Sequence, residues 1–149
     1  MLSPETIRTA PKVLLHDHLD GGLRASTIVE LAKDLGVKSL PTYNVTELDN
    51  WMAATADRKD LELYLEAFSH TLSVMQTQDA LYRVAAECAE DLARDGIIYA
   101  EVRFAPELHL SKGLTVTQVI ESVLEGFKSG SEGRGIIVNA LICAIRSNS

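Results

Sequence analysis

The stretch that decides the fold is PKVLLHDHLDGGLR, residues 11–24. An apolar run ends in two histidines separated by one residue, and a glycine-containing turn follows directly. We predict a buried strand over residues 13–18, in which alternate side chains point to the same side of a sheet. His16 and His18 therefore project together, whereas Asp17 projects the other way. Two imidazoles on one side of a strand end can bind one divalent metal ion.

Outward from this stretch, helical patterns alternate with short apolar runs, which is typical of parallel β/α units. We expect an α/β fold in a single domain over residues 1–149, with three parallel strands and a helical insertion between the first two. Three such strands leave an apolar edge unpaired, so either the sheet closes within an oligomer or these residues form the front part of a larger barrel. We predict helices over 26–36, 47–54, 61–75, 79–96 and 115–130, and further strands over 97–104 and 136–145.

The first of these helices carries signals at both of its ends. Thr27 and Glu30 have the spacing of a capping box, which predicts the start of the helix. Gly36 stands where a helix stop is expected.

Composition narrows the class of function. Hydrophobic residues make up 46% and charged residues 23% of the 149 residues, and the net charge is -7. An acidic chain of this kind does not favour a nucleic-acid partner, and no apolar stretch is long enough for a membrane span. We expect a cytoplasmic protein that acts on small molecules. Cys88 and Cys143 are interpreted as unpaired, buried residues rather than as a disulfide or a metal pair.

Of three other polar residues near these segments, Asp20 and His109 are candidates for the same site and His70 is not. Asp20 lies on the turn after the first strand, where its carboxylate can bond a substrate hydroxyl or a histidine. His70 falls in a helix and is expected on a partly exposed face, while His109 follows the second strand and a role in the site stays open. From spacing alone, His16 and His18 remain either metal ligands or ordinary imidazoles.

Four segments together resemble one protein family. PKVLLHDHLDGGLR resembles the opening motif of adenosine deaminases, P-K-x-E-L-H-x-H-L-D-G-x-L-R. GIIYAEVRFAPELH (96–109) resembles their second strand, and LYLEAFSHTLSVMQT (63–77) and NALICAIR (139–146) resemble later segments in the right order. The resemblance covers residues 11–146.

The resemblance implies a zinc-dependent (β/α)₈ barrel more than twice as long as this chain. By position, His16 and His18 match the first two zinc ligands, and Asp20 matches the residue that contacts the ribose of the substrate. His18 also lies against the substrate in the family. Leu65 and Phe68 match an apolar wall of the pocket.

The implied reaction is hydrolytic deamination of adenosine to inosine and ammonia, a step of purine nucleoside salvage. The other zinc ligands, the proton donor and the water-orienting groups follow the third strand in the family. We therefore expect catalytic residues only beyond residue 149, and no useful deamination by the 149-residue chain alone. One alternative is a related adenine or adenine-nucleotide aminohydrolase. Another is a non-catalytic fragment that binds a second copy or a missing half through its open sheet edge.

Two departures from the family pattern lead to further hypotheses. Leu15 stands where the family has glutamate, and Asp17 stands where it has a small apolar residue. If both positions share one face, the acid has moved along the strand, and Asp17 is either a buried partner for a basic group or a solvated carboxylate. In the second strand, Glu101 and Arg103 alternate with apolar residues. We expect them on the inner face, in one polar network beneath the metal site or in a structural ion pair.

Overall fold

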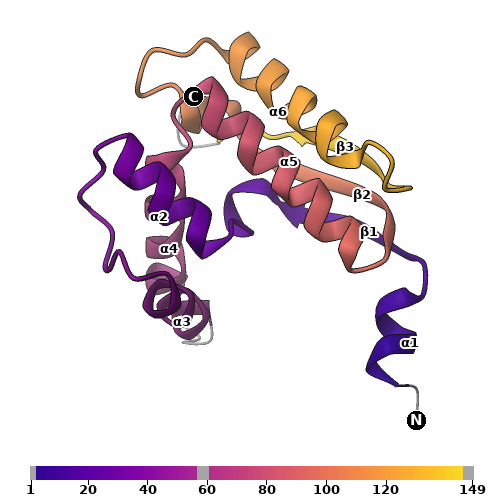
Figure 1. Ribbon diagram of the computed structural model, residues 1–149. Coiled ribbons are helices and arrows are strands. Elements are labelled where there is room, and N and C mark those ends of the chain that lie inside the picture. The colour runs from indigo at the N-terminus through magenta and orange to yellow at the C-terminus, as the bar shows by residue number, and fades with distance from the viewer. Residues whose placement is uncertain (1–2, 57–60, 146–149) are drawn as a thin grey trace.

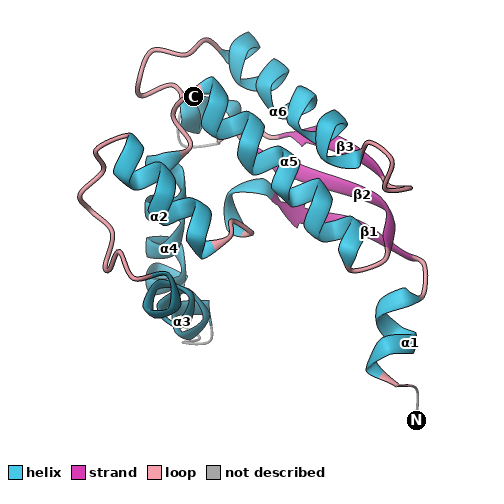
Figure 2. Cartoon of the chain, in the orientation of Figure 1, coloured by secondary structure: helices cyan, strands magenta, loops and turns pink. Residues whose placement is uncertain are grey.

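A computed structural model describes residues 3–56 and 61–145. Within these ranges the sheet has three parallel strands in the order β1 (Lys12–His18), β2 (Ile97–Phe104) and β3 (Ile137–Ile142). Helices α5 (Gln78–Arg94) and α6 (Val116–Ser131) lie side by side over one face of it (Figure 2). The α/β class and the parallel order agree with the sequence-based expectation.

The remaining helices form the insertion between β1 and β2, apart from one at the N-terminus. The insertion lies beside the sheet as a separate group in Figure 1. The first helix, with all of its residues exposed, extends away from the body and was not predicted. The helices are α1 (Pro4–Thr9), α2 (Ala25–Asp34), α3 (Val45–Ala56) and α4 (Leu61–Val74), and short 3₁₀ turns span Leu19–Gly21 and Pro106–His109.

The start of α2 differs from the prediction. Arg24 is the N-cap, and Thr27 lies inside the helix, where its buried hydroxyl donates to Glu87 Oε2 at 2.5 Å. The capping box was therefore wrong, because Thr27 contacts α5 instead of its own helix. The predicted stop holds, since Gly36 has a φ of 67°, which only glycine adopts without strain.

Close contact between α5 and α6 depends on two glycines of α6. A Cβ on Gly126 would lie 2.3 Å from the Tyr82 carbonyl oxygen, and one on Gly130 would lie 2.2 Å from the Ala86 carbonyl oxygen. The absence of side chains there allows the helix backbones to approach, and the pair covers the buried face of the sheet. That face carries Ala100, whose side chain is fully buried.

No helix of the described ranges is long and apolar enough to cross a membrane.

A bulge in β1 determines which of its side chains face the helices. Leu14 pairs with Ala100 and Asp17 pairs with Val102, so β1 has one extra residue between these pairs. Since Ala100 and Val102 are buried against the helices, Leu14 and Asp17 share their face. Leu15 is 60% exposed and does not belong to it. The expectation that Leu15 and Asp17 share a face was wrong, because the bulge interrupts the alternation. The assignment of Leu15 to the glutamate position of the family motif was also wrong, since that position is Leu14, which does share the face of Asp17.

Asp17 has a different environment from the one expected. Its Oδ1 accepts a hydrogen bond from the backbone N–H of His18 at 2.9 Å. Over residues 3–56 and 61–145, no basic side chain forms an ion pair with it. Burial raises the pKa of Cys88 on α5 to about 12, and the charge of Asp17 adds to this shift. Asp17 therefore faces α5 without the predicted basic partner.

Candidate active site

The two histidines of β1 meet at the carboxyl end of the sheet. His16 Nε2 and His18 Nε2 are 3.3 Å apart, and the ring centroids are separated by 5.3 Å. Both rings lie on the face opposite the helices, as the alternation predicted. Arg103 Nη1, from the neighbouring strand, lies 3.4 Å from His16 Nε2.

This nitrogen pair fits two positions of a zinc site. Two imidazole nitrogens at about 2.0–2.1 Å from a tetrahedral ion are separated by roughly 3.4 Å. The separation of the two Nε2 atoms, 3.3 Å, is close to this value. In the part of the chain that the structure describes, no group of three or more His, Cys, Asp or Glu side chains could hold an ion. His16 and His18 therefore provide two donors, and a complete zinc site needs more.

Asp20 extends the site from the 3₁₀ turn that follows β1. Its side chain is buried, and its Oδ1 lies 3.9 Å from His18 Nδ1. Within the described ranges this oxygen is buried without a hydrogen-bond partner. A buried carboxylate oxygen without a donor is costly, so it is suited to accept a hydrogen bond from a bound molecule.

A cavity of about 510 Å³ opens beside these residues at the ends of the strands. Leu72 of α4 and Leu108 of the turn after β2 belong to its apolar wall, and the ring of Phe68 meets that of His18 edge-on, with centroids 6.4 Å apart. Leu65, the other expected wall residue, has a side chain outside the described part of the structure. The lining consists of His18, Asp20, Phe68, Ser69, Leu72, Arg103, Phe104, Ala105, Leu108, Cys143 and Ile145.

The other two histidines lie in different surroundings. His109 is fully buried, with Nδ1 3.0 Å from the Met75 carbonyl oxygen. Burial lowers the pKa of His109, and the Met75 hydrogen bond and the charge of Asp20 oppose this shift only in part. His70 packs edge-on against Trp51, with centroids 5.3 Å apart. The structure thus places His109 behind the cavity and His70 within the helical insertion.

The polar residues of β2 divide into two groups. The Tyr99 hydroxyl donates to Glu101 Oε1 at 2.9 Å and accepts from Asn139 Nδ2 at 3.1 Å. Arg103 instead lies against His16. Within the described ranges no ion pair joins Glu101 to Arg103, since Glu101 accepts from Tyr99 and the Arg103 guanidinium lies toward His16. The expected single network and the expected ion pair are therefore both absent from these ranges.

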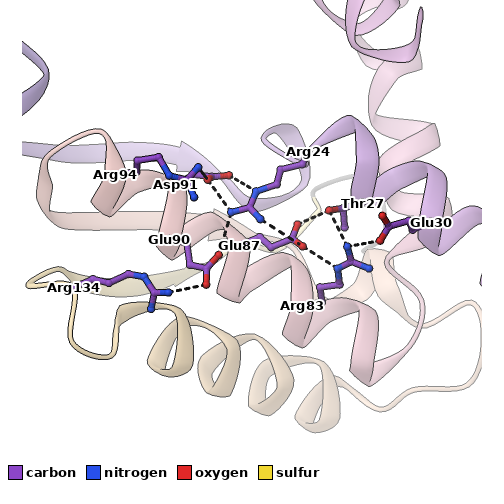
Figure 3. A network of polar contacts seen from close by, with 9 residues as sticks. All are labelled: Arg24, Thr27, Glu30, Arg83, Glu87, Glu90, Asp91, Arg94 and Arg134. Carbon is purple, nitrogen blue, oxygen red and sulfur yellow. Dashed lines mark hydrogen bonds and ion pairs between the residues drawn. The ribbon is translucent and has the colours of Figure 1, made fainter. Parts of the chain in front are cut away.

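Arg24 is a site-supporting residue that the sequence-based reasoning missed. Its guanidinium donates to both carboxylate oxygens of Asp91 at 2.8 Å and to Glu90 at 3.1 Å, which ties the start of α2 to α5 (Figure 3). The hydrogen bond from Arg24 lowers the pKa of Asp91, and the same bond raises the pKa of Arg24. Because Arg24 follows Asp20 by four residues, this anchor fixes the turn that carries the carboxylate. The final Arg of the LDGGLR segment was the available signal.

A second arginine extends the same network along α5. Arg83 donates to Glu87 at 2.9 Å and to Glu30 of α2 at 2.7 Å, and Figure 3 shows the two arginines on either side of Glu87. Arg134, which follows α6, donates to Glu90 at 3.0 Å. The network thus joins α2, α5 and the segment before β3.

Comparison with known proteins identifies the family to which this chain belongs. The family model described as adenosine deaminase matches residues 11–149. The chain belongs to the adenosine deaminase family. Adenosine deaminase 1 from Streptomyces coelicolor is 60% identical over 149 residues, an alignment that covers 97% of this chain and 38% of that protein. The chain therefore spans about two fifths of the length of this relative.

Solved structures show the same partial correspondence. An adenine deaminase from Arthrobacter aurescens is 25% identical with a TM-score of 0.71, covering 87% of this chain and 38% of that one. An amidohydrolase from Burkholderia ambifaria with bound zinc is 22% identical with a TM-score of 0.75, covering 95% of this chain and 38% of that one. The three strands and their helices are thus the first three β/α units of a (β/α)₈ barrel, with a helical insertion between the first two strands.

Proposed function

We propose that this chain is part of a zinc-dependent adenosine deaminase that hydrolyses adenosine to inosine and ammonia. The observation that carries the proposal is the pair of facing Nε2 atoms of His16 and His18, 3.3 Å apart. This pair lies beside an apolar cavity, and the buried Asp20 Oδ1 in its lining has no hydrogen-bond partner among the described residues. The chain is 60% identical to an adenosine deaminase.

His16 and His18 would hold the zinc ion through their Nε2 atoms. When bound, zinc supplies Lewis-acid activation of water for attack on the purine ring. Binding through Nε2 leaves the hydrogen of each neutral ring on Nδ1. His18 therefore presents an Nδ1–H donor on the side where Asp20 lies.

His18 and Asp20 together would recognise a sugar hydroxyl. A hydroxyl both donates and accepts, so it can donate to the unpaired Asp20 Oδ1 and accept from His18 Nδ1–H. These two atoms are 3.9 Å apart, and both residues line the cavity. Phe68, Leu72 and Leu108 would then contact the purine, since they provide apolar surface on the same cavity.

The remaining groups of the reaction belong to segments that follow residue 149 in the relatives, and this part of the proposal rests on the family resemblance. Only two nitrogen donors meet among the described residues, so we expect weak zinc binding and no measurable deamination by the isolated 149-residue chain.

The open face of the sheet carries the exposed apolar side chains of Val13, Leu15 and Ile137, which support the rest of the barrel as the partner that packs there. Free cysteines support a reducing compartment, in which cytoplasmic purine metabolism takes place.

An adenine aminohydrolase is the second candidate, since an adenine deaminase shares the fold at 25% identity. Adenine has no sugar hydroxyl, so it leaves Asp20 Oδ1 without a donor. The buried Asp20 Oδ1, which has no hydrogen-bond partner in the described ranges, and the much higher identity to an adenosine deaminase favour the nucleoside.

Steady-state kinetics of the complete protein with adenosine and with adenine test this proposal. Asp20→Asn should lower kcat/KM for adenosine roughly ten- to hundredfold, because a hydrogen bond to a charged group is lost. Asp34→Asn, which changes an exposed carboxylate at the end of α2, should leave both activities unchanged. Turnover of adenine in preference to adenosine, or equal effects of Asp20→Asn on both substrates, would contradict the proposal.

A further inference from the structure

We propose that Gln76 is a positioning residue that fixes the two apolar walls of the cavity to each other and so sets the width of the cavity. One wall is the C-terminal half of α4, with Phe68 and Leu72, and the other is the segment after β2, with Ala105 and Leu108. The bridge itself is argued from contacts in the structure, and only the identity of the molecule that the cavity binds rests on the proposed function.

Gln76 uses all four of its hydrogen-bonding positions, and it is 5% exposed. Its amide nitrogen donates to the Leu72 carbonyl at 2.8 Å and to the Leu108 carbonyl at 3.0 Å. Its Oε1 accepts from the backbone N–H of Ser111 at 3.1 Å and from the Ser111 hydroxyl at 2.6 Å. An amide supplies two donors and two acceptor lone pairs, so no other uncharged side chain of this length makes the same four bonds.

A second hydrogen bond joins the same two segments. His109 Nδ1 lies 3.0 Å from the carbonyl oxygen of Met75, the residue before Gln76. Because a carbonyl only accepts, Nδ1 carries the hydrogen and the neutral ring is held in one tautomer. Met75 and Gln76 therefore hold the segment 108–111 at two points, the buried His109 and the exposed Ser111.

The bonded carbonyls belong to the residues that line the cavity. Leu72 and Leu108 each give a side chain to the lining and a carbonyl oxygen to the Gln76 amide. One amide group thus bridges the two walls directly. Loss of this bridge removes the Gln76 bonds to the Leu108 carbonyl and to the Ser111 N–H, whereas the Leu72 carbonyl still accepts from the Met75 N–H at 3.2 Å. The segment after β2 then gains freedom to move away from α4.

Amide hydrogen exchange on the protein tests the bridge without any activity measurement. In Gln76→Met, which keeps the length of the side chain and removes its polar atoms, we expect exchange over residues 105–111 to be at least tenfold faster. Exchange within α5 and α6 should stay as in the wild type. Gln78→Met changes an exposed glutamine two residues away and is the matched control, with no expected effect.

A crystal structure of the Gln76→Met variant measures the cavity itself. We expect a larger separation between the Leu72 and Leu108 backbones than in wild-type crystals. Unchanged exchange at 105–111, equal acceleration throughout the protein, or an unchanged separation would overturn the inference. Absence of adenosine turnover by the complete wild-type protein would instead count against the proposed function, so the two failures are distinguishable.

Discussion

At the residue scale, the candidate site combines two facing imidazoles with a buried carboxylate oxygen, Asp20 Oδ1, that has no hydrogen-bond partner among the described residues. Strand alternation was sufficient to place His16 and His18 on one face, where their Nε2 atoms lie 3.3 Å apart. The same alternation failed for Leu15, since nothing in the residue pattern shows where an extra residue is accommodated. His109 could not be assigned from sequence, because its position depends on a contact with Met75, 34 residues away.

The pH dependence of stability tests the environment of His109. Burial lowers the pKa of His109 in the folded state, whereas an unfolded histidine titrates near about 6.5. Below that pH the unfolded chain binds a proton that the folded chain does not, so this contribution to stability falls as the pH decreases toward the folded pKa.

We therefore expect the free energy of unfolding to fall less steeply between pH 7 and pH 5 in His109→Asn than in the wild type, at up to about 1.4 kcal/mol per pH unit for one proton. Urea denaturation at a series of pH values measures both slopes. Identical slopes would show that His109 is not held neutral by burial.

At the scale of the elements, most strands and helices were predictable from their periodicity and end signals. The strands β1 and β2 and the ends of α2 and α5 at Gly36 and Gly96 follow local rules, since both glycines have positive φ. The false capping box at Thr27 and the role of Arg24 required tertiary information, because both side chains bond to α5 rather than to their own helix. Polar contacts between distant elements leave no periodic pattern in the sequence.

The network of Figure 3 gives a prediction for the anchor of α2. Arg24→Ala should lower the free energy of unfolding by about 1 kcal/mol, because several partly exposed ion pairs are lost together. Arg94→Ala is the control, since Arg94 is 71% exposed and contacts only Asp91 within the network. Thermal or urea unfolding at neutral pH measures both effects, and equal effects would refute the special role of Arg24.

Arg24→Ala should also change how the free energy of unfolding depends on pH. Arg24 lowers the pKa of Asp91, so this stabilisation is present above the unfolded value of about 3.9 and is lost as the pH falls through the folded pKa. The difference between wild type and Arg24→Ala should therefore shrink in acid.

At the scale of the whole molecule, the sheet is covered on one face and open on the other, and the site lies at the carboxyl ends of the strands. This is the end at which (β/α)₈ barrels carry their active sites. The family resemblance, more than composition or periodicity, indicated that the three β/α units belong to a longer barrel. The chain spans 38% of the length of its relative from Streptomyces coelicolor, which agrees with a site that has two nitrogen donors among the described residues.

Zinc affinity, measured by competition with a chelator, tests the central claim that His16 and His18 are the metal-binding half of the site. His16→Ala and His18→Ala should each weaken zinc binding roughly tenfold or more, because each removes one nitrogen donor. His70→Ala is the matched control and should bind zinc as the wild type does, since His70 packs against Trp51 in the insertion. Unchanged affinity in both β1 variants, or an equal loss in His70→Ala, would contradict the claim.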